Sequence, residues 1–235
     1  MHASNAQDFA LLDHPIWHSL TTTHAHLALG TSLARRYPPE IGPLAALREP
    51  TPEAYAELAA LTPAGDVVVL FLDEKPTTPI GWELVRDGRL VQMLCPVAPD
   101  VPATDHPLIP LSPFDFPEMV DLAKLTEPGP FRALTAELGS FLGIRVDGRL
   151  AAMAGERLAP TGFTEVSAVC THPEFRGRGY AQALVAESTR NIHATGRMPF
   201  LTSFEHNASA VRVYQRLGFS IRRSFELAVL RPPQR

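Results

Sequence analysis

An arginine-glycine loop carries the clearest chemical signal in this sequence. Residues 176–179 read Arg-Gly-Arg-Gly, and the apolar positions of a helix begin at Ala181. The first N–H groups of a helix have no partner inside it, and the helix dipole is positive there, so anions are favoured at this end. The glycines have no Cβ to keep an anion away from the backbone, and the arginines add charge. The loop therefore predicts a cradle for a pyrophosphate group.

Two other kinds of phosphate loop fit this segment less well. No Lys-Ser or Lys-Thr follows the glycines, as a Walker A loop requires. Gln182 stands three residues after Gly179, where a dinucleotide-binding turn has its third glycine. A nucleotide-binding protein is therefore the weakest functional hypothesis. A tight surface turn with solvated arginines is the remaining alternative, and the four residues alone do not decide against it.

Apolar periodicity and turn residues predict the elements that position this loop. An apolar strand over residues 163–171 ends before it, and the helix that follows it ends at Gly196. Asp147-Gly148 is a strong hairpin signal. The other predicted elements of this half are strands 141–146, 150–156, 199–204 and 219–230 (one long strand or two) and a capped helix over 207–217. The order indicates an α/β (α+β) fold, a mixed sheet with helices on its faces.

Two blocks of this half resemble the GNAT acyltransferases. The loop, Arg176-Gly177-Arg178-Gly179-Tyr180-Ala181, directly follows Val169-Cys170-Thr171-His172-Pro173 and matches the family's acyl-CoA loop, Arg/Gln-x-x-Gly-x-Gly/Ala, at every specified position. The second block is Asn207-Ala-Ser-Ala-Val-Arg-Val-Tyr214-Gln-Arg-Leu-Gly-Phe219. The resemblance covers residues 131–230 and implies a mostly antiparallel sheet flanked by helices. The same half is also similar to the glycine N-acyltransferase-like branch.

The resemblance implies that the chain binds acetyl-CoA and releases CoA. It places pantetheine along the edge of strand 163–171, where a backbone N–H would stabilise the oxyanion. It also implies that Tyr214 protonates the departing thiolate; a core aromatic residue is the alternative. Asn207 is first of all a helix cap. The expected cofactor-binding residues are Val169, Cys170, Thr171, Arg176, Gly177, Arg178, Gly179, Tyr180, Ala181 and Asn207.

A carboxylate must take a proton from the acceptor amine, which is mostly protonated at neutral pH. Glu165, at the start of the cofactor strand, is the candidate base. The period of a strand places it on the same face as Ser167 and Val169. Glu156, at the end of the preceding strand, is the rival. A solvated surface position is the alternative for a lone glutamate at a strand end.

A proline-rich run over residues 96–117 divides the chain into an N-terminal α/β unit, 1–110, and a GNAT-like unit, 111–235. The tetrapeptide Asp-Gly-Arg-Leu occurs at Asp87 and again at Asp147. Shared hairpin chemistry explains this, or the first unit is a degenerate GNAT copy. The other predicted features are a helix over 51–61, a strand over 66–72, a hairpin with strands 80–85 and 90–94, and a capping box of Asp115 and Glu118.

Composition limits the classes of partner that the chain is expected to bind. An apolar fraction of 45% predicts a packed core, and a net charge of −4 argues against nucleic-acid binding. Cys95 and Cys170 lie in apolar runs and are expected to be free buried thiols. His24 and His26 lack a third ligand at suitable spacing, so no metal is expected. Neither a leader segment nor an apolar run of about 18 residues is present, which predicts a cytoplasmic protein with no membrane contact.

The functional hypothesis is an N-acetyltransferase that moves an acetyl group from acetyl-CoA to a primary amine of a small molecule by direct attack. The alternative is a non-catalytic acyl-CoA-binding regulatory module. Tyr214 together with Glu165 favours the enzyme, because a binding module needs neither. The sequence leaves open the acceptor, the acyl length and the oligomeric state.

Overall fold

An eight-stranded sheet runs through the structure, a computed structural model that describes residues 8–233. Its strand order is β4-β11-β5-β10-β9-β8-β7-β6, and neighbours are antiparallel except for β9 and β10. The strands are β4 Val68–Leu72, β5 Glu83–Leu94, β6 Leu108–Pro110, β7 Phe141–Val146, β8 Arg149–Glu156, β9 Phe163–Thr171, β10 Met198–Phe204 and β11 Ser220–Arg231. The expected mixed, mostly antiparallel sheet is confirmed.

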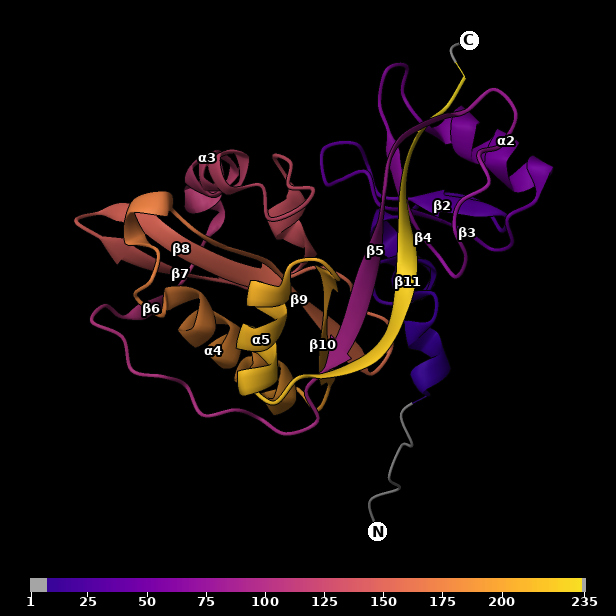
Figure 1. Ribbon diagram of the computed structural model, residues 1–235. Coiled ribbons are helices and arrows are strands. Elements are labelled where there is room, and N and C mark those ends of the chain that lie inside the picture. The colour runs from indigo at the N-terminus through magenta and orange to yellow at the C-terminus, as the bar shows by residue number, and fades with distance from the viewer. Residues whose placement is uncertain (1–7, 234–235) are drawn as a thin grey trace.

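Helices cover both faces of this sheet, as Figure 1 shows for α3 above β7 and β8 and for α4 and α5 below them. α1 (Pro15–Thr21) and α3 (Phe116–Thr126) pack on one face, and α4 (Tyr180–Ala194) and α5 (Ala208–Arg216) on the other. Neighbouring strand residues point to opposite faces, so Leu90 packs with α1 whereas Val91 packs with α4.

A small three-stranded sheet precedes the large one in the chain. It consists of β1 (Leu29–Gly30), β2 (Ala34–Arg36) and β3 (Ala45–Leu47), and α2 (Pro52–Leu61) packs beside it. The predicted helix 51–61 is confirmed, since the Thr51 hydroxyl accepts a hydrogen bond from the Ala54 N–H at 3.3 Å. Short 3-10 helices complete the chain: η1 Phe9–Leu12, η2 Ala25–Leu27, η3 Pro113–Asp115, η4 Thr135–Leu138 and η5 Pro173–Phe175.

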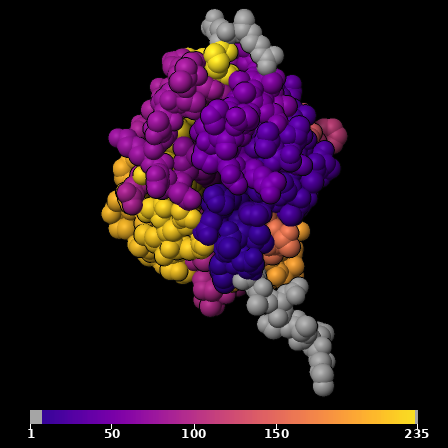
Figure 2. Space-filling model, turned by 90° about the vertical axis from the view of Figure 1, so that its right-hand side faces the viewer, coloured from indigo at the N-terminus to yellow at the C-terminus, as the bar shows by residue number. Residues whose placement is uncertain are grey.

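The large sheet takes strands from both sides of the boundary expected near residue 110. β4, β5 and β6 precede that boundary, and β5 pairs with both β10 and β11. Figure 2 shows the indigo and magenta N-terminal half packed directly against the yellow C-terminal segment. The division into residues 1–110 and 111–235 stays a prediction, as does the origin of the first unit as a degenerate GNAT copy.

The hairpin predicted at Asp87-Gly88 is wrong. Both residues lie in the middle of β5, opposite Ala228 and Leu227 of β11. The same dipeptide at Asp147-Gly148 does form the β7–β8 turn, with φ values of 49° and 78°. The long ladder to β11 outweighs the local turn preference in β5, because it pairs residues all along the strand. A Cβ on Gly88 would lie 3.0 Å from the Phe204 ring, so a larger residue there would need the ring to shift.

The predicted capping box at Asp115 and Glu118 is also wrong. Ser112 and Asp115 form the box instead, with the Asp115 carboxylate accepting from the Ser112 N–H and hydroxyl at 2.8 Å each. Glu118 is drawn into tertiary contacts, because its carboxylate accepts from the Leu150 N–H at 2.8 Å and pairs with Arg145 at 2.7 Å. It therefore ties α3 to the β7–β8 hairpin.

A partly buried cluster of one carboxylate and two guanidinium groups joins the two halves of the chain. Asp66 pairs with Arg36 at 3.1 Å and with Arg132 at 2.6 Å, and Arg132 also donates to the Pro39 carbonyl at 2.7 Å. Burial alone would raise the pKa of Asp66, but hydrogen bonds from Arg132, the Val67 N–H and Arg36 outweigh burial and lower the pKa to about 2.

We expect Asp66→Asn to lower the free energy of unfolding at pH 7 by about 2 kcal/mol. The reason is that the folded protein stabilises the charged carboxylate, as the lowered pKa shows, and asparagine carries no charge. Stability from a lowered pKa is complete above the unfolded value, about 3.9, and is lost as the pH falls through the folded value. Urea unfolding of wild type and variant should therefore converge near pH 2. Asp121→Asn, an exposed control, should change stability by less than about 0.5 kcal/mol. Equal effects of the two substitutions would contradict the prediction.

Candidate active site

A cleft of about 800 Å³ passes through the large sheet beside the arginine-glycine loop. Val166 and Tyr214 line it and pack on the α4–α5 face of the sheet. Leu90 and Leu227 also line it, although both belong to the core on the α1 face. The cleft therefore reaches from the loop on one face of the sheet to apolar side chains on the other.

The opening in the sheet lies between β9 and β10. The two strands pair only from Phe163 opposite Met198 to Glu165 opposite Phe200. Beyond that point β10 stays with β5, and β9 stays with β8. The edge of β9 over residues 166–171 thus faces the cleft without a strand partner on that side. The backbone N–H and C=O groups that point away from β8 are available to an extended ligand, as at other open sheet edges.

A bulge at Ala168 changes the faces of β9. Ala168 has φ 53°, and the β8–β9 register shifts between Ser167 and Cys170. Val169 consequently packs in the same core region as Val166 rather than on the face of Glu165. The strict alternation predicted for Glu165, Ser167 and Val169 is therefore wrong, because one extra residue inverts the period of two.

The loop presents backbone N–H groups to the cleft. Gly177 and Gly179 have φ values of 81° and 80°, and a Cβ at either position would meet nothing within 4 Å. Gly179 is the N-cap residue of α4, and no side chain within residues 8–233 caps the helix there. The uncapped donors are left for a ligand. Arg178 lies over the Phe175 ring at 5.3 Å, and the Arg176 side chain donates to the Thr171 carbonyl at 3.4 Å.

All ten residues expected to bind the cofactor line this one cleft: Val169, Cys170, Thr171, Arg176, Gly177, Arg178, Gly179, Tyr180, Ala181 and Asn207. The side chains of Tyr180 and Cys170 are buried in the core, so these two can offer a ligand mainly their backbone. Asn207 caps α5, where its carboxamide oxygen accepts from the Ala210 N–H at 3.2 Å. The roles of the ten residues toward a cofactor stay proposals.

Tyr214 lines the cleft from α5. Its ring packs edge-on against Phe219, with 6.1 Å between ring centroids, and no residue in 8–233 pairs with its hydroxyl. Loss of solvent around the half-buried side chain raises the pKa of Tyr214 to about 12. The phenol therefore keeps its proton throughout the neutral range, as a proton donor must.

Glu165 lies behind the cleft wall rather than in it. Its fully buried carboxylate accepts two hydrogen bonds from Arg157, at 2.9 and 3.0 Å, and one from the Thr202 hydroxyl at 2.7 Å. Burial alone would lower the pKa of Arg157, but the charge of Glu165 and its hydrogen bonds outweigh burial and raise that pKa. Arg157 and Thr202 themselves line the cleft.

Glu156, the rival base, borders a small hollow that adjoins the cleft, because residues 128–130, Arg157, Ser167 and Ala168 line both. Burial raises the pKa of Glu156. Glu127, which the sequence pattern did not single out, is the one carboxylate among the described residues that line the cleft. It directly follows α3 in a left-handed conformation, φ 49°, and is exposed. No sequence motif includes Glu127. It reaches the cleft because the tertiary structure places the end of α3 there.

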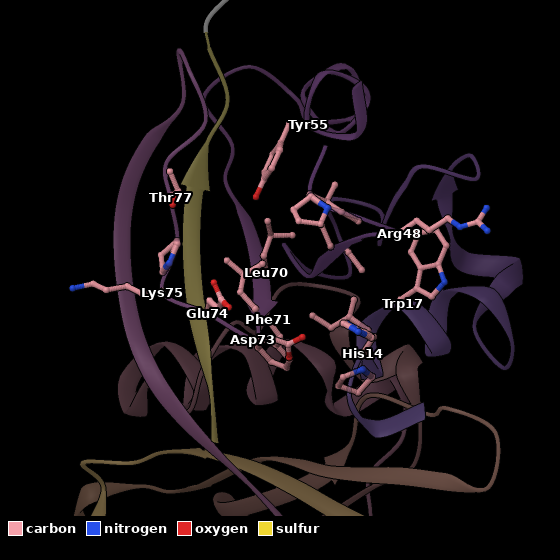
Figure 3. Close-up of a pocket in the computed structure, with 18 residues that line it drawn as sticks. His14, Trp17, Arg48, Tyr55, Leu70, Phe71, Asp73, Glu74, Lys75 and Thr77 are labelled. Carbon is pink, nitrogen blue, oxygen red and sulfur yellow. The ribbon is translucent and has the colours of Figure 1, made fainter. Parts of the chain in front are cut away.

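A second cavity, of about 470 Å³, lies against the other side of β4 (Figure 3). Phe71 borders both cavities, and Tyr55 and Glu74 point into the second one from α2 and from the loop after β4. None of the residues in the two GNAT-like blocks lines it. The site chemistry therefore belongs to the cleft through the sheet.

The remaining titratable candidates are structural. His26 lies in η2, His24 is the residue before that helix, and the His24 ring nitrogen is 2.8 Å from the Tyr37 hydroxyl. Burial lowers the pKa of His24 to about 4. Cys95 and Cys170 are free and buried, and burial raises the pKa of each thiol to about 11. Residues 8–233 contain no cluster of three metal-ligating side chains.

Over the same described range, no helix combines the length and the apolar character that crossing a membrane requires.

Comparison with known proteins gives a family match and several structural matches. The family model of FR47-like proteins matches residues 141–227. A protein from Novosphingobium aromaticivorans DSM 12444, assigned to the GNAT family of acetyltransferases, has a solved structure similar to this chain. The two share 41% identity over 95% of this chain and 99% of that one, with a TM-score of 0.86. No curated protein matches the sequence.

Two more distant solved structures show the same fold. The GCN5-related N-acetyltransferase from Kribbella flavida is 18% identical over 94% of this chain and 96% of that one, with a TM-score of 0.63. A GCN5-related N-acetyltransferase-like protein from Streptococcus suis 89/1591 is 13% identical over 87% and 82%, with a TM-score of 0.58. The glycine N-acyltransferase-like branch stays a prediction. With the relative at 41% identity, the uncapped α4 loop and the β9–β10 opening, the chain belongs to the GNAT family of acetyltransferases.

Proposed function

We propose that this protein transfers an acetyl group from acetyl-CoA to a primary amine of a small molecule. The observation that carries the proposal is the continuity of the cleft, which joins the uncapped start of α4, the open edge of β9 and an apolar end on the opposite face. The phosphates of acetyl-CoA fit at the start of α4, and its extended, amide-containing pantetheine arm fits along the edge of β9. The acceptor fits at the apolar end. The free buried thiols agree with a cytoplasmic location.

The bound acetyl-CoA supplies a thioester, and the chain supplies position and proton transfer. Gly177, Gly179 and the first turn of α4 hold the pyrophosphate through backbone N–H groups, with Arg176 and Arg178 adding charge. The N–H groups on the open edge of residues 166–171 would pair with the pantetheine amides, and one near Val169 would donate to the carbonyl oxygen as it becomes negative. The amine nitrogen would bond to the carbonyl carbon, and Tyr214 would donate its proton to the sulfur as the C–S bond breaks.

The acceptor loses its proton on the α1 face of the sheet. Glu165 was the carboxylate expected from the sequence, but Arg157 and Thr202 occupy its oxygens. Exposure and position in the cleft wall support Glu127 better, acting directly or through one water molecule. On this proposal Glu165 is a positioning residue that acts through Arg157.

The two carboxylates should give different variant phenotypes. Glu127→Gln is expected to lower kcat by about 10²-fold while leaving the midpoint of thermal unfolding unchanged, as loss of a general base does. Glu165→Gln is expected to destabilise the fold by about 3 kcal/mol, because it leaves a buried guanidinium without its charge partner. Initial rates at saturating amine, together with thermal melts, separate them. A larger loss of kcat in a folded Glu165→Gln protein would return the base role to Glu165.

Calorimetric titration with acetyl-CoA, with ATP as the parallel control, tests the proposal. Binding of acetyl-CoA alone, followed by amine-dependent release of thiol, is the expected result. Binding without thiol release with any amine would instead support the regulatory acyl-CoA-binding module. Lack of binding would exclude both.

A further inference from the structure

The far end of the cleft is an apolar wall supplied mainly by the N-terminal half. Strand pairing makes the wall continuous, since Phe204 lies opposite Leu90, Leu227 opposite Phe71, and Val69 beside Leu44. The residues of this wall are Leu44, Val69, Phe71, Leu90, Phe204 and Leu227. An amine that reaches the thioester from this side must therefore carry an apolar body, because a polar one would lose its hydration without gaining partners.

One fixed polar group adjoins this wall. Arg157 donates through Nε and Nη2 to Glu165, and through Nη2 to the Thr202 hydroxyl at 3.4 Å. Thr202 and Phe204 lie two residues apart on β10, so Arg157 sits next to the apolar wall. Its remaining nitrogen, Nη1, has no partner within residues 8–233 and belongs to a side chain that lines the cleft. Arg157 Nη1 is therefore a hydrogen-bond donor whose position is fixed by the bonds of the other two nitrogens.

The charges around Arg157 select the kind of oxygen that it can bind. Glu165 already neutralises the guanidinium. The other cations of the cleft wall are Arg176, Arg178 and Arg216. They lie on the loop and α5, where we place the phosphates of acetyl-CoA. Those phosphates carry a total charge of about −4, more than these arginines can neutralise. A carboxylate on the acceptor would thus meet a site without spare positive charge, whereas a neutral oxygen needs only the donor.

We infer that the acceptor is a primary amine on an apolar body that also carries a neutral carbonyl oxygen, and that Arg157 Nη1 donates a hydrogen bond to this oxygen. The inference rests on the proposed acetyl transfer and names the substrate class of the same site. Arg157 is a specificity-determining residue, and Glu165 orients it.

Four commercially available amines test the inference with the wild-type protein. Phenylalaninamide has both the apolar body and the neutral carbonyl; phenethylamine lacks the carbonyl, phenylalanine has a carboxylate, and glycinamide lacks the apolar body. We expect kcat/KM for phenylalaninamide to exceed that for each of the other three amines by about tenfold or more. Loss of one charge-assisted hydrogen bond, or of the burial of an apolar group, has an effect of this size. A preference for phenylalanine or glycinamide would overturn the inference.

The carbonyl also changes the basicity of the amine, so a difference between two amines does not by itself identify the hydrogen bond. The decisive quantity is the effect of a variant on the ratio of kcat/KM for phenylalaninamide to kcat/KM for phenethylamine. Arg157→Lys keeps the charge that pairs with Glu165 and removes Nη1, and should lower the ratio about tenfold. Arg197→Lys, a control outside the cleft wall whose Nη1 donates to Thr164 at 3.4 Å, should leave the ratio unchanged. An unchanged ratio in Arg157→Lys overturns the inference.

The controls separate this inference from the proposed function. Thiol release with phenethylamine and phenylalaninamide at equal kcat/KM would overturn the acceptor class and leave the acetyltransferase intact. Binding of acetyl-CoA without reaction of any of the four amines would also overturn the acceptor class, and thiol release with other amines would then separate the acetyltransferase from the binding module. Failure to bind acetyl-CoA at all would overturn both.

Discussion

Gly179→Val is expected to weaken acetyl-CoA binding by about 10²–10⁴-fold, the worth of two lost hydrogen bonds to a charged group. Gly179 stands at the start of α4 with φ 80°, and its Cβ position is open space within the cleft wall. A valine side chain would occupy the volume in which we place the pyrophosphate. It would also pull the backbone out of the left-handed region, in which a β-branched residue is strained.

Gly196→Val is the matched control for this experiment. Gly196 follows the other end of α4, has φ 76°, and a Cβ there also meets nothing within 4 Å. It lies outside the cleft wall. Both variants suffer the same kind of backbone strain, so both should melt at a lower temperature than wild type. Only Gly179→Val should lose affinity in calorimetric titration. Equal affinities in the two variants would show that the loop is a structural turn.

Tyr214→Phe is expected to lower kcat by about 10²–10⁴-fold while leaving the affinity for acetyl-CoA nearly unchanged. The substitution removes a hydroxyl that no described residue binds and keeps the ring against Phe219. Little structural stability is therefore at stake. Single-turnover thiol release should show the full loss. A loss below about threefold would make Tyr214 a core aromatic residue.

The pKa of Tyr214 sets the pH dependence of this effect. A group with a raised pKa keeps its proton until the pH approaches the raised value, here about 12. The proton donor should therefore cause no fall in wild-type kcat between pH 7 and about 10, the range below an ordinary tyrosine pKa. Tyr55→Phe is the control, because burial also raises the pKa of Tyr55 although it lies at the second cavity. Its kcat should match that of wild type.

Local features of the site could be predicted from the sequence because they depend on neighbouring residues. The left-handed conformations of Gly177 and Gly179 and the cap at Asn207 follow from residue type and spacing within a few positions. Periodicity likewise indicated β9, α4 and α5. The ten residues expected at the cofactor site therefore line a single cleft.

Contacts between distant segments decided the rest. Asp87-Gly88 became part of a long strand because β11 offered a ladder, and the bulge at Ala168 inverted the faces predicted for β9. Glu165 met Arg157 and Thr202 only when β8, β9 and β10 came together. The energies of these contacts depend on partners that are far away in the chain, so a short sequence pattern does not predict them.

By itself, the sequence determined the family of folds, the glycine-arginine loop in which we place the phosphates, and the candidate proton donor Tyr214. The tertiary structure alone decided which carboxylate faces the cleft, which guanidinium lines it, and that the N-terminal half supplies the apolar wall. The physical reason is range: backbone conformation and helix ends are set within a turn or two of chain. A binding surface is set by which side chains the sheet brings together across 60 residues or more, as from Leu90 to Phe204.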